Sequence, residues 1–476
     1  MPESLSRSIV VHGHFYQPPR ENPWTGEVDP EPTAAPFHDW NQRIESECYA
    51  PVASARVLRP DGSVGHRDNL YASMSFDVGP TLFEWMETHA ASTYNSILEA
   101  DKLSAARLGY GNAIAMPYHH TILPLASRRD KVTEVSWGIA EFHRRFERAP
   151  DGMWLPETAV DEETLEVLAE AGIGFTILAP HQVEKVSHDG LPLRFTAANG
   201  REIALCIYDA KLAADIAFGR LIRDGAALAN RLAPSDDVLI TAAAMDGETF
   251  GHHHRFGEMA LARALRLLNE RDDIRIENFA SFLARNPPRE VAVLVSPSSW
   301  SCTHGIERWR SDCGCALAPE KETSQAWRSS LRDGLDWLAD ELHKIFELEG
   351  GELFMADPWR VRDRYGDVIG ASEAKVLAFV AESIERRNDG ARIERAAELL
   401  ALEESALSMF TSCAWFFDDL ARIETIKVLK YAAFAIELSG DAARLEAGLL
   451  ARIGDATSSD PAEGTGRDIW RTKVKP

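Results

Sequence analysis

The sequence predicts an α/β fold in which parallel strands are joined by helices, followed by a helical C-terminal domain. Short apolar runs alternate with amphipathic stretches over about the first 290 residues, which is typical of parallel strands with helical crossovers. From residue 324 onward helical periodicity dominates. A chain of 476 residues is long enough for a barrel with one or two added domains.

The elements of the first part follow from these two periodicities. Apolar runs predict strands at residues 8–15, 70–76, 152–156, 175–179 and 238–245, with a shorter run at 113–118. Helices are predicted at residues 38–58, 81–108, 132–148, 161–171 and 256–271, with Asp161 as an N-cap. Asn199-Gly200 is a strong hairpin signal, because both residues tolerate positive φ. We therefore expect an antiparallel hairpin at residues 193–208, inserted between barrel units.

Four segments are expected along the chain. Residues 1–290 form the barrel, and residues 291–322 form a connecting segment that contains tryptophan and cysteine. Residues 323–457 form the helical domain, with helices expected at 324–347, 372–387, 393–417 and 423–438. Residues 458–476 are polar and are expected to form a loose tail.

Composition and charge exclude several classes of partner. The formal net charge of −23 repels phosphate backbones and anionic lipid, so we expect neither a nucleic-acid nor a membrane partner. A neutral oligo- or polysaccharide is unaffected by that charge. Residues 1–8 are polar, the apolar run at 9–11 is too short for a signal peptide, and no window reaches the ~18 apolar residues of a membrane span. Since Cys48, Cys206 and Cys413 are isolated in sequence, as buried thiols of reducing compartments are, we expect a cytoplasmic protein.

Polar and aromatic residues are concentrated at four predicted strand ends. Catalytic groups of parallel barrels lie where strands end, so this shared position is a stronger signal than any one motif. The motifs are His12-Gly-His14-Phe-Tyr-Gln17, Pro117-Tyr-His119-His120, Trp154-Leu-Pro-Glu157 and Asp246-Gly-Glu248-Thr-Phe-Gly-His252-His-His254.

Glu157 and Asp246 are candidates for a catalytic pair. Glycoside cleavage needs two carboxyl groups on opposite sides of the sugar C1, one to attack and one to protonate the leaving oxygen. Each residue closes a predicted strand, and Trp154 precedes Glu157 as an aromatic that could stack on a sugar ring. Taken singly, Glu157 could be a helix-start carboxylate, and Asp246-Gly-Glu248 a plain turn. Together they predict a cleft with the two carboxyl groups about 5–7 Å apart.

The histidines also allow a metal-dependent hydrolase or deacetylase. His12 and His14 face the same side of a strand and could bind Zn²⁺ with Asp246. Three consecutive histidines at 252–254 cannot all converge on one ion, and a neutral imidazole also serves as a hydrogen-bonding partner of sugar hydroxyls. We expect no catalytic metal and no cofactor, with His12, His14 and Glu248 lining the cleft.

Cysteines and tryptophans leave two further questions open. Cys302, Cys313 and Cys315, with His304 nearby, could form a structural zinc site, a redox pair, or simply buried thiols, since the spacing is not the usual one for zinc. Trp300 and Trp415 could stack on sugars, although most tryptophans are packing residues. The run Trp415-Phe-Phe-Asp-Asp419 cannot place three aromatics on one helix face, so we expect it to reach the barrel mouth and line the cleft.

At these motifs the sequence resembles glycoside hydrolase family 57. The resemblance rests on His12-Gly-His14-Phe-Tyr-Gln17-Pro-Pro, Trp154-Leu-Pro-Glu157 and Asp246-Gly-Glu248-Thr-Phe-Gly, with a weaker match at Ser412-Cys-Ala-Trp415-Phe-Phe-Asp-Asp419. It implies a distorted (β/α)7 barrel whose cleft is completed by a helical domain. It also implies retaining chemistry on α-glucans or α-galactosides without a metal.

The resemblance assigns roles to individual residues. Glu157 would be the nucleophile and Asp246 the general acid/base, while His12, His14 and Gln17 would line the donor subsite. Two departures indicate a divergent subgroup: Phe15-Tyr16 stands before Gln17, and Gly111-Asn112-Ala113 lacks the acid usual in the second motif.

Three classes of function therefore compete. The favoured one is a retaining α-glycosidase or α-glucanotransferase, with His119, Trp154, Glu248, Trp300, Trp415 and Asp419 as further substrate-binding residues. The alternatives are a metal-dependent deacetylase or hydrolase and a glycan-binding protein without catalysis. The presence of both Glu157 and Asp246 disfavours the last.

Overall fold

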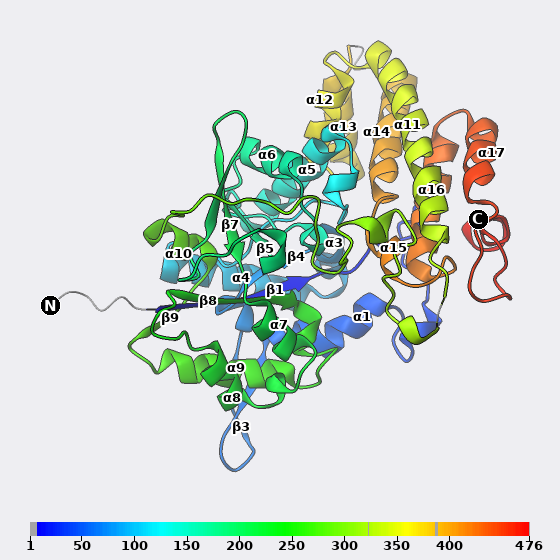
Figure 1. The fold of residues 1–476 in the computed structure, drawn as a ribbon. Helices are drawn as coiled ribbons and strands as arrows, with labels where there is room; N and C mark the ends of the chain where they lie inside the picture. Colours follow the sequence, from blue (N-terminus) through cyan, green and yellow to red (C-terminus); the bar gives the residue numbers. More distant parts are fainter. Residues whose placement is uncertain (1–6, 322, 386–388, 476) are drawn as a thin grey trace. The chain divides into compact units, whose positions relative to one another are not determined.

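The computed structural model describes residues 7–321, 323–385 and 389–475 (Figure 1). The chain divides into two compact units. Unit 1 comprises Met1–Gln17, Pro30–Met116 and Phe142–Ser296, and unit 2 comprises Pro18–Asp29, Pro117–Glu141 and Pro297–Pro476. Two excursions of the N-terminal part thus belong with the helical unit, which a division at residue 290 does not anticipate.

The sheet of unit 1 is parallel and centred on β1 (Arg7–Phe15). β1 pairs in parallel with β4 (Ser75–Val78), β8 (Ile240–Asp246) and β9 (Ile274–Ile276), which are labelled in Figure 1. Eight of its nine residues are buried, because a parallel strand is covered on both faces. This burial explains the apolar run at residues 9–11, after which His12 and His14 stand out as polar residues of a buried strand.

The sheet continues around a ring. Single parallel bridges lead from Phe76 to Ala113, from Ala115 to Met153 and from Gly152 to Phe175, which begins β5 (Phe175–Leu178). β5 pairs in parallel with β7 (Glu202–Ile207), and just after β7 the Asp209 N–H donates to Ala242 O of β8 at 2.8 Å. The path therefore has seven parallel positions, two of them held only by single bridges. The predicted distorted (β/α)7 barrel is confirmed.

The residues predicted as a hairpin form β6 (Leu193–Thr196) and β7, which pair antiparallel across Gly200 at φ +82°. We predicted an insertion between barrel units. Instead β7 is itself a barrel position, because its other edge pairs in parallel with β5. Its buried apolar residues serve the barrel and the hairpin together.

Helices cover the outside of this sheet. α8 and α9 pack against each other, and α9 also contacts β9 and the small antiparallel pair of β2 (Ala55–Leu58) and β3 (Val64–Asp68). The Asp161 carboxylate accepts from Thr164 N, which confirms the predicted N-cap of α6. In chain order the helices of unit 1 are α1 (Trp40–Ile44), α2 (Ala50–Ala53), α3 (Pro80–His89), α4 (Ala91–Leu108), α6 (Glu162–Glu170), α7 (Ala210–Ala217), α8 (Gly225–Leu232), α9 (Gly257–Asn269) and α10 (Phe279–Arg285).

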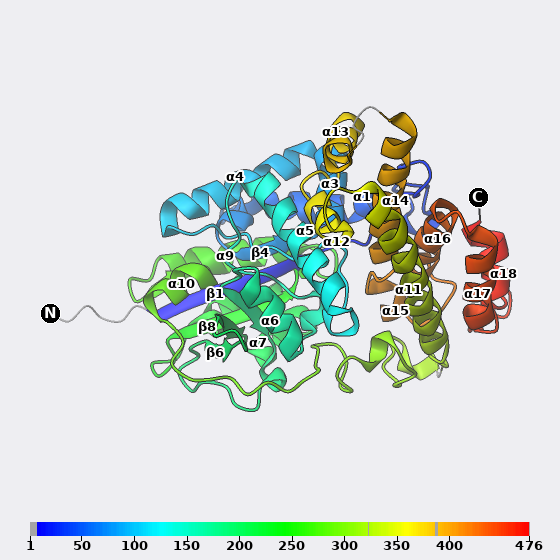
Figure 2. The ribbon, with the colours of Figure 1, turned by 90° about the horizontal axis from the view of Figure 1, so that it is seen from above.

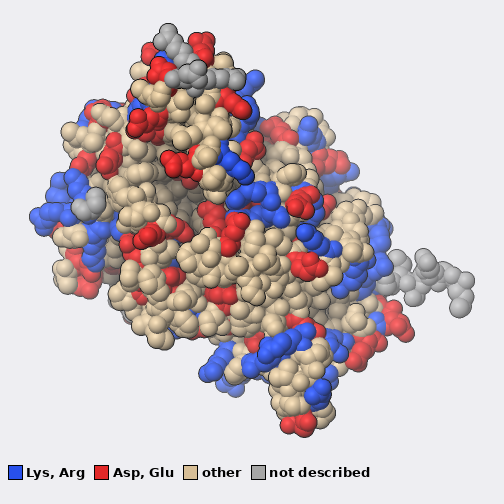
Figure 3. Space-filling model, turned by 180° about the vertical axis from the view of Figure 1, so that it is seen from behind, with Lys and Arg blue, Asp and Glu red and all other residues tan. Residues whose placement is uncertain are grey.

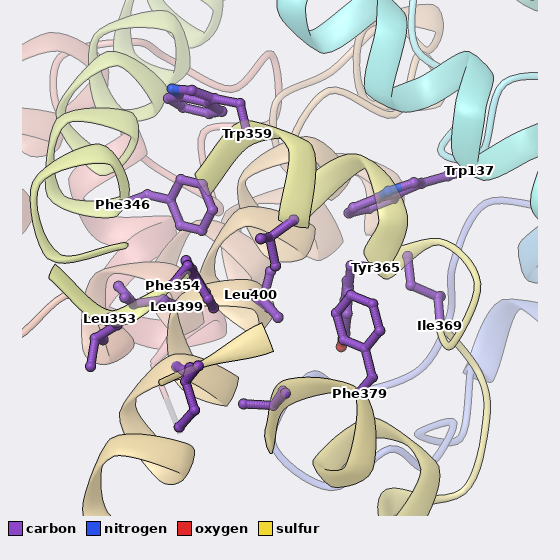
Figure 4. Packing of buried hydrophobic residues seen from close by; sticks show 14 of the residues in the cluster. Trp137, Phe346, Leu353, Phe354, Trp359, Tyr365, Ile369, Phe379, Leu399 and Leu400 are labelled. Atoms are coloured by element: carbon purple, nitrogen blue, oxygen red, sulfur yellow. The ribbon is translucent and has the colours of Figure 1, made fainter. Parts of the chain in front are cut away.

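Unit 2 is helical, and α11 (Trp327–Leu353), α14 (Gly390–Ser408) and α16 (Ile423–Leu438) run side by side in it (Figures 1 and 2). An aromatic core packs Trp137, Phe346, Trp359, Tyr365 and Phe379 around Leu399 and Leu400 (Figure 4). The remaining helices are α12 (Pro358–Tyr365), α13 (Glu373–Ser383), α15 (Cys413–Phe416), α17 (Ala442–Ile453) and α18 (Gly466–Ile469), while α5 (Arg128–Phe146) spans residues of both units.

The predicted loose tail is ordered over its described part. Thr465 and Asp468 form a capping box that starts α18, and a π-helical turn, Trp470–Val474, follows. Trp470 is buried and its indole N–H donates to Glu446 at 3.0 Å. The polar composition of residues 458–476 suggested a loose tail, but buried Ile469, Trp470 and Val474 attach it to the rest of unit 2.

The formal net charge of the chain is −23. On the face shown in Figure 3, acidic and basic side chains are mixed, and no large acidic patch is visible. Among the helices that the structure describes, none is both long enough and apolar enough to span a bilayer.

Candidate functional site

The carboxyl ends of β8, β1 and β4 bring three chemically active residues into one row. In the parallel register His14 lies opposite Asp77 on one side and opposite Asp246 on the other. Side chains at paired positions of neighbouring strands point to the same face. The sequence motif at residues 12–17 and the motif at residue 246 are therefore neighbours, as predicted, and Asp77 joins them.

Asp77 holds both histidines. Its Oδ1 lies 3.0 Å from His12 Nε2 and its Oδ2 lies 2.7 Å from His14 Nδ1, while Ser75 Oγ lies 3.0 Å from His12 Nδ1. Asp77 and His12 have no exposed surface, and His14 is almost fully buried. Each imidazole therefore has a fixed orientation that does not depend on substrate.

The electrostatics of this trio separate the two histidines. Burial lowers the pKa of His12, so it is neutral. Burial alone would also lower the pKa of His14, but the negative charges of Asp77, Asp246 and Glu248 raise it to about 9. Burial would raise the pKa of Asp77, yet the two histidines hold it below its usual value. At neutral pH the trio contains one imidazolium, one neutral imidazole and one carboxylate.

The indole ring of Trp154 stacks on both imidazoles. Its ring centroid lies 5.0 Å from that of His12 and 5.0 Å from that of His14, with interplanar angles of 21° and 19°. Trp154 has no exposed surface. Our expectation of a sugar-stacking platform is therefore not met in this structure, because the Trp154 ring is fully buried and stacks on protein side chains.

The Asp246 side chain is accessible to solvent and is also surrounded by protein atoms. Its side chain is exposed at the end of β8, yet desolvation raises its pKa, reinforced by Asp77 and opposed by His14. A group that solvent reaches while protein atoms surround it lies in a concavity, which reconciles these two observations. Next along the chain, a Cβ at Gly247 would collide with the Phe15 ring, so only glycine fits between Asp246 and Glu248.

Glu248 is buried and accepts a hydrogen bond of 2.5 Å from Tyr49 Oη and one of 3.3 Å from Tyr16 N. Desolvation and the charge of Asp246 raise the pKa of Glu248 to about 7, against the opposing effects of Tyr49 and His14. Gln17 hydrogen-bonds the same tyrosine hydroxyl. Gln17 and Glu248, predicted from separate motifs, therefore meet at Tyr49.

Glu157 lies in a strained turn, Pro156–Thr158. It has φ +57° and ψ +18°, and Thr158 follows at φ +48°. Left-handed backbone is unfavourable for both residues and is an outlier for a β-branched threonine. Gln182, with no exposed surface, clamps the turn: its Nε2 donates to Thr158 O at 2.7 Å and its Oε1 accepts from Thr158 Oγ1 at 2.8 Å. Such strain is retained where a side chain must be presented in one direction.

The ring topology places Glu157 and Asp246 far apart around the barrel but at the same end. Glu157 follows the bridge position at Gly152–Met153, and Asp246 ends β8. In one direction around the ring, β5 and β7 lie between the two residues. In the other direction, β1, β4 and the position at residues 113–115 lie between them. In a seven-position ring this is the largest possible separation, so the two carboxyl groups approach from opposite walls.

Five other sequence-predicted residues belong to unit 2: His119, His120, Trp300, Trp415 and Asp419. His119 is buried, with its Nδ1 2.9 Å from Glu134 Oε1, and Trp300 is partly exposed. Asp419 accepts from Ser458 Oγ at 2.8 Å and from Ser459 N at 2.6 Å, so it ties the C-terminal segment to the helices. His120, from the same motif as His119, contacts Ser412 Oγ at 2.6 Å.

Trp415 was expected to line the cleft but has no exposed surface. Its indole N–H donates to Arg328 O at 3.2 Å, and the Arg332 guanidinium stacks 4.3 Å above its ring. The reasoning that three consecutive aromatics must diverge holds, but Phe416 and Phe417 are the ones that turn outward. The first aromatic of the run packs inward within unit 2.

The strand-end histidines do not group around a common metal position. His252 Nδ1 lies 2.5 Å from Glu47, and His254 Nε2 lies 2.7 Å from Ala217 O. Within the described ranges, the one group of three or more His, Cys, Asp or Glu ligand atoms close enough to share an ion lies elsewhere, at Cys302, His304, Cys313 and Cys315.

The segment Gly111-Asn112-Ala113, which lacks the acid usual in the second motif, makes structural contacts. Asn112 Nδ2 donates to Tyr71 O at 2.9 Å, and Ala113 N donates to Asp101 Oδ1 at 2.8 Å. A side chain on Gly111 would collide with Arg148 and Asp101. This segment is therefore built for packing.

Sequence reasoning missed Asp77, Tyr49 and Gln182. For Asp77 a signal existed: it directly follows a predicted strand, like the residues that were found. Tyr49 lies in the π-helical turn Glu45–Tyr49, inside a stretch predicted as an ordinary helix. Gln182 follows β5 in a short 3-10 turn, and no motif marks it.

Comparisons with known proteins agree with this geometry. The model of the family described as glycosyl hydrolase family 57 matches residues 38–295, a range that includes Glu157 and Asp246 but begins after His14. A model described as a domain of unknown function (DUF3536) matches residues 324–476. No curated protein matched the sequence.

Solved structures resemble the chain in fold. An exo-type maltose-forming amylase from Pyrococcus sp. ST04 has a TM-score of 0.72 at 15% identity, covering 93% of this chain and 82% of that one. A GH57-type branching enzyme from Pyrococcus horikoshii has a TM-score of 0.57 at 14% identity, covering 98% and 95%. An α-amylase from Thermotoga maritima has a TM-score of 0.52 at 13% identity, covering 94% of each chain.

Proposed function

We propose that this chain, which belongs to glycosyl hydrolase family 57, is a retaining enzyme that cleaves or transfers α-glycosidic bonds of α-glucans. The substrate class is supported by the similar structures, which include a maltose-forming amylase and a branching enzyme. The observation that carries the proposal is the pair of carboxyl groups at one end of the barrel: Glu157, presented by a clamped left-handed turn, and Asp246, accessible but desolvated.

The two residues divide the chemistry between them. Glu157 attacks the anomeric carbon while Asp246 donates its proton to the leaving glycosidic oxygen, which forms a glycosyl ester on Glu157. Asp246 then removes a proton from water or from a sugar hydroxyl, which attacks the same carbon and releases Glu157. A raised pKa suits Asp246 to the first step, because the group must carry a proton near neutral pH.

The buried residues around this pair act on charge and orientation. The His14 imidazolium lies between Asp77 and Asp246 and limits the rise in the pKa of Asp246. Glu248 and Gln17 are joined through Tyr49, and we propose that they hydrogen-bond sugar hydroxyls. Charge separation in a site that excludes water is stabilised by such fixed groups.

The test compares Glu157→Gln and Asp246→Asn with the surface controls Glu270→Gln and Asp272→Asn on maltodextrins. Loss of the acid/base should lower kcat by about 10²–10⁴-fold, and loss of the nucleophile by at least as much. The controls should retain wild-type rates. Azide should restore turnover to Glu157→Ala as a glycosyl azide of inverted configuration. If both site variants keep wild-type rates on every α-glucan that the enzyme accepts, the assignment is wrong.

Product analysis separates hydrolysis from transfer. Release of reducing ends from maltoheptaose indicates hydrolysis, whereas a spread of shorter and longer chains without new reducing ends indicates transfer. NMR of the first product should show the α-anomer, since two displacements retain configuration. An initial β-anomer would refute the retaining mechanism.

Two further expectations belong to this proposal. Activity should survive a brief exposure to EDTA, because none of the proposed steps uses a metal. We also propose a cytoplasmic location, supported by six cysteines, none of which forms a disulfide in the structure.

A further inference from the structure

Four potential ligands converge in the connecting segment of unit 2. Cys302, His304, Cys313 and Cys315 each offer one ligand atom, and these four atoms all lie within 4.8 Å of one another. Cys302 is buried, and the other three are partly or fully accessible from solvent. None of the proposed catalytic steps uses this cluster.

The separations between the sulfurs match a metal site better than a disulfide. Cys302 Sγ lies 3.9 Å from Cys313 Sγ and 3.8 Å from Cys315 Sγ. Zn–S bonds of about 2.3 Å in a tetrahedron place sulfurs about 3.8 Å apart. A disulfide would require about 2.05 Å. The distance of 3.7 Å from Cys315 Sγ to His304 Nδ1 is close to the ~3.6 Å expected for a sulfur–nitrogen edge of the same tetrahedron.

The backbone is shaped to present these side chains. Gly314 lies between two of the cysteines at φ +82°, and Gly305 follows His304 at φ +82°, so both turns use a conformation that favours glycine. The N–H groups of His304 and Arg308 hydrogen-bond Cys302, and the N–H of Thr303 hydrogen-bonds Cys315. Backbone donors aimed at sulfur stabilise thiolates that coordinate a metal.

A buried cation balances the charge of such a site. Three thiolates and one Zn²⁺ leave a net charge of −1. Arg328 has no exposed side-chain surface, donates to Cys315 O at 2.8 Å and interacts electrostatically with Cys313 and Cys315. An arginine buried in this position is favourable when the cluster beside it is anionic.

We propose that Cys302, His304, Cys313 and Cys315 bind one Zn²⁺ as a structural site. Three sulfurs and one imidazole are a ligand set that zinc prefers, and four protein ligands leave no open position for catalysis.

The ion would organise the segment that contacts α15 and its end. Arg308 donates to Phe416 O at 2.8 Å, and Arg328 donates to Phe417 O at 3.3 Å. Asp418 accepts from Leu317 N at 2.9 Å. The connecting segment and the start of α11 therefore contact residues 416–418 from several sides within unit 2, and loss of the ion should loosen them.

The first experiment measures metal in the full-length protein purified without metal-affinity chromatography. We expect about one zinc per chain by mass spectrometry, released in step with three thiols when they are titrated with a mercurial. Replacement by Co²⁺ should give thiolate-to-cobalt charge transfer and the intense visible bands of a tetrahedral site. Both readouts use the wild-type chain, so they do not depend on a variant that folds.

The second experiment compares Cys315→Ser with Cys413→Ser, a partly accessible cysteine of the same unit outside the cluster. The first variant should contain little zinc and the second should keep one ion per chain. The proposal is overturned if the wild type contains no zinc and takes up none under reducing conditions. A disulfide between two of the three cysteines in the freshly purified protein would also overturn it, because it would indicate a redox pair.

Discussion

Gln182→Ala tests whether the strained turn positions Glu157. Gln182 makes at least three hydrogen bonds from a fully buried position: two to Thr158, and one in which its Oε1 accepts from Ala179 N at 2.9 Å. Each is worth about 1 kcal/mol net, so the variant should lose about 3 kcal/mol of unfolding free energy. That lies within the strain of two left-handed residues, about 2–6 kcal/mol in total at about 1–3 kcal/mol each.

Without the clamp, the turn should relax toward an ordinary conformation. A shift of about 1 Å in a reacting group costs about 10²-fold in rate. We therefore expect kcat on maltodextrin to fall by about 10²-fold with little change in KM, since the proposed substrate-binding residues are untouched. Gln182→Glu keeps the acceptor but loses the donor to Thr158 O, and its kcat should lie between those of the wild type and Gln182→Ala.

Asn278→Ala is the matched control. Asn278 is a buried amide of unit 1 that donates to Tyr110 O, Gly111 O and Asn112 Oδ1, each at 3.0 Å, and caps α10. It should lose at least as much stability by urea unfolding while keeping its kcat. If Gln182→Ala unfolds more easily but turns over at the wild-type rate, the clamp does not position Glu157 and the reasoning fails.

Three further predictions concern the buried residues at the strand ends. The pKa of His14 is raised from 6.5 to about 9, so its protonation contributes about 3 kcal/mol to the free energy of unfolding below pH 6.5, and this contribution is lost as the pH rises through 9. The difference in unfolding free energy between wild type and His14→Gln should therefore shrink by about 3 kcal/mol from pH 6.5 to above pH 9. A difference that stays constant over this range would contradict the prediction. The pKa of Glu248 is raised from 4.5 to about 7, so the wild type should lose about 3 kcal/mol of unfolding free energy relative to Glu248→Gln as the pH rises from 4.5 to 7. The prediction is refuted if urea unfolding gives the same difference between the two proteins at both pH values. Trp154→Ala should cost about 3–5 kcal/mol, and an unchanged urea midpoint would show that the ring does not support the histidines.

The barrel strands could be predicted because their residues are buried on both faces. Apolar runs located β1, β5 and β8 to within about two residues. The run at 152–156 was also apolar, but only Gly152 and Met153 form bridges, because pairing depends on neighbours distant in sequence. The helix predicted at 81–108 is two helices that meet at Ala90, whose φ of −136° leaves the helical region although its neighbours favour helix.

The site was predictable where chemistry interrupts an apolar run. His12, His14 and Asp246 stand out because polar side chains are rare at the ends of buried strands. Tyr49 does not, since a tyrosine in a helical stretch is an ordinary core residue, and only the fold brings it to Glu248. The same ambiguity misled the interpretation of Trp415, whose neighbours suggested a cleft but whose ring packs against α11.

The Trp154-Leu-Pro-Glu157 motif acquires its meaning from the contacts on either side of it. Trp154 stacks under the two imidazoles of β1, and three residues later Glu157 is turned out by a left-handed backbone. Leu155 and Pro156 between them are buried, so the segment has little freedom to flex. The position of the proposed nucleophile is thereby coupled to the histidines that set the charge near Asp246. An aromatic residue beside a catalytic carboxylate can thus support protein side chains instead of a sugar, and a sequence motif cannot distinguish the two because both require the same residue at the same spacing.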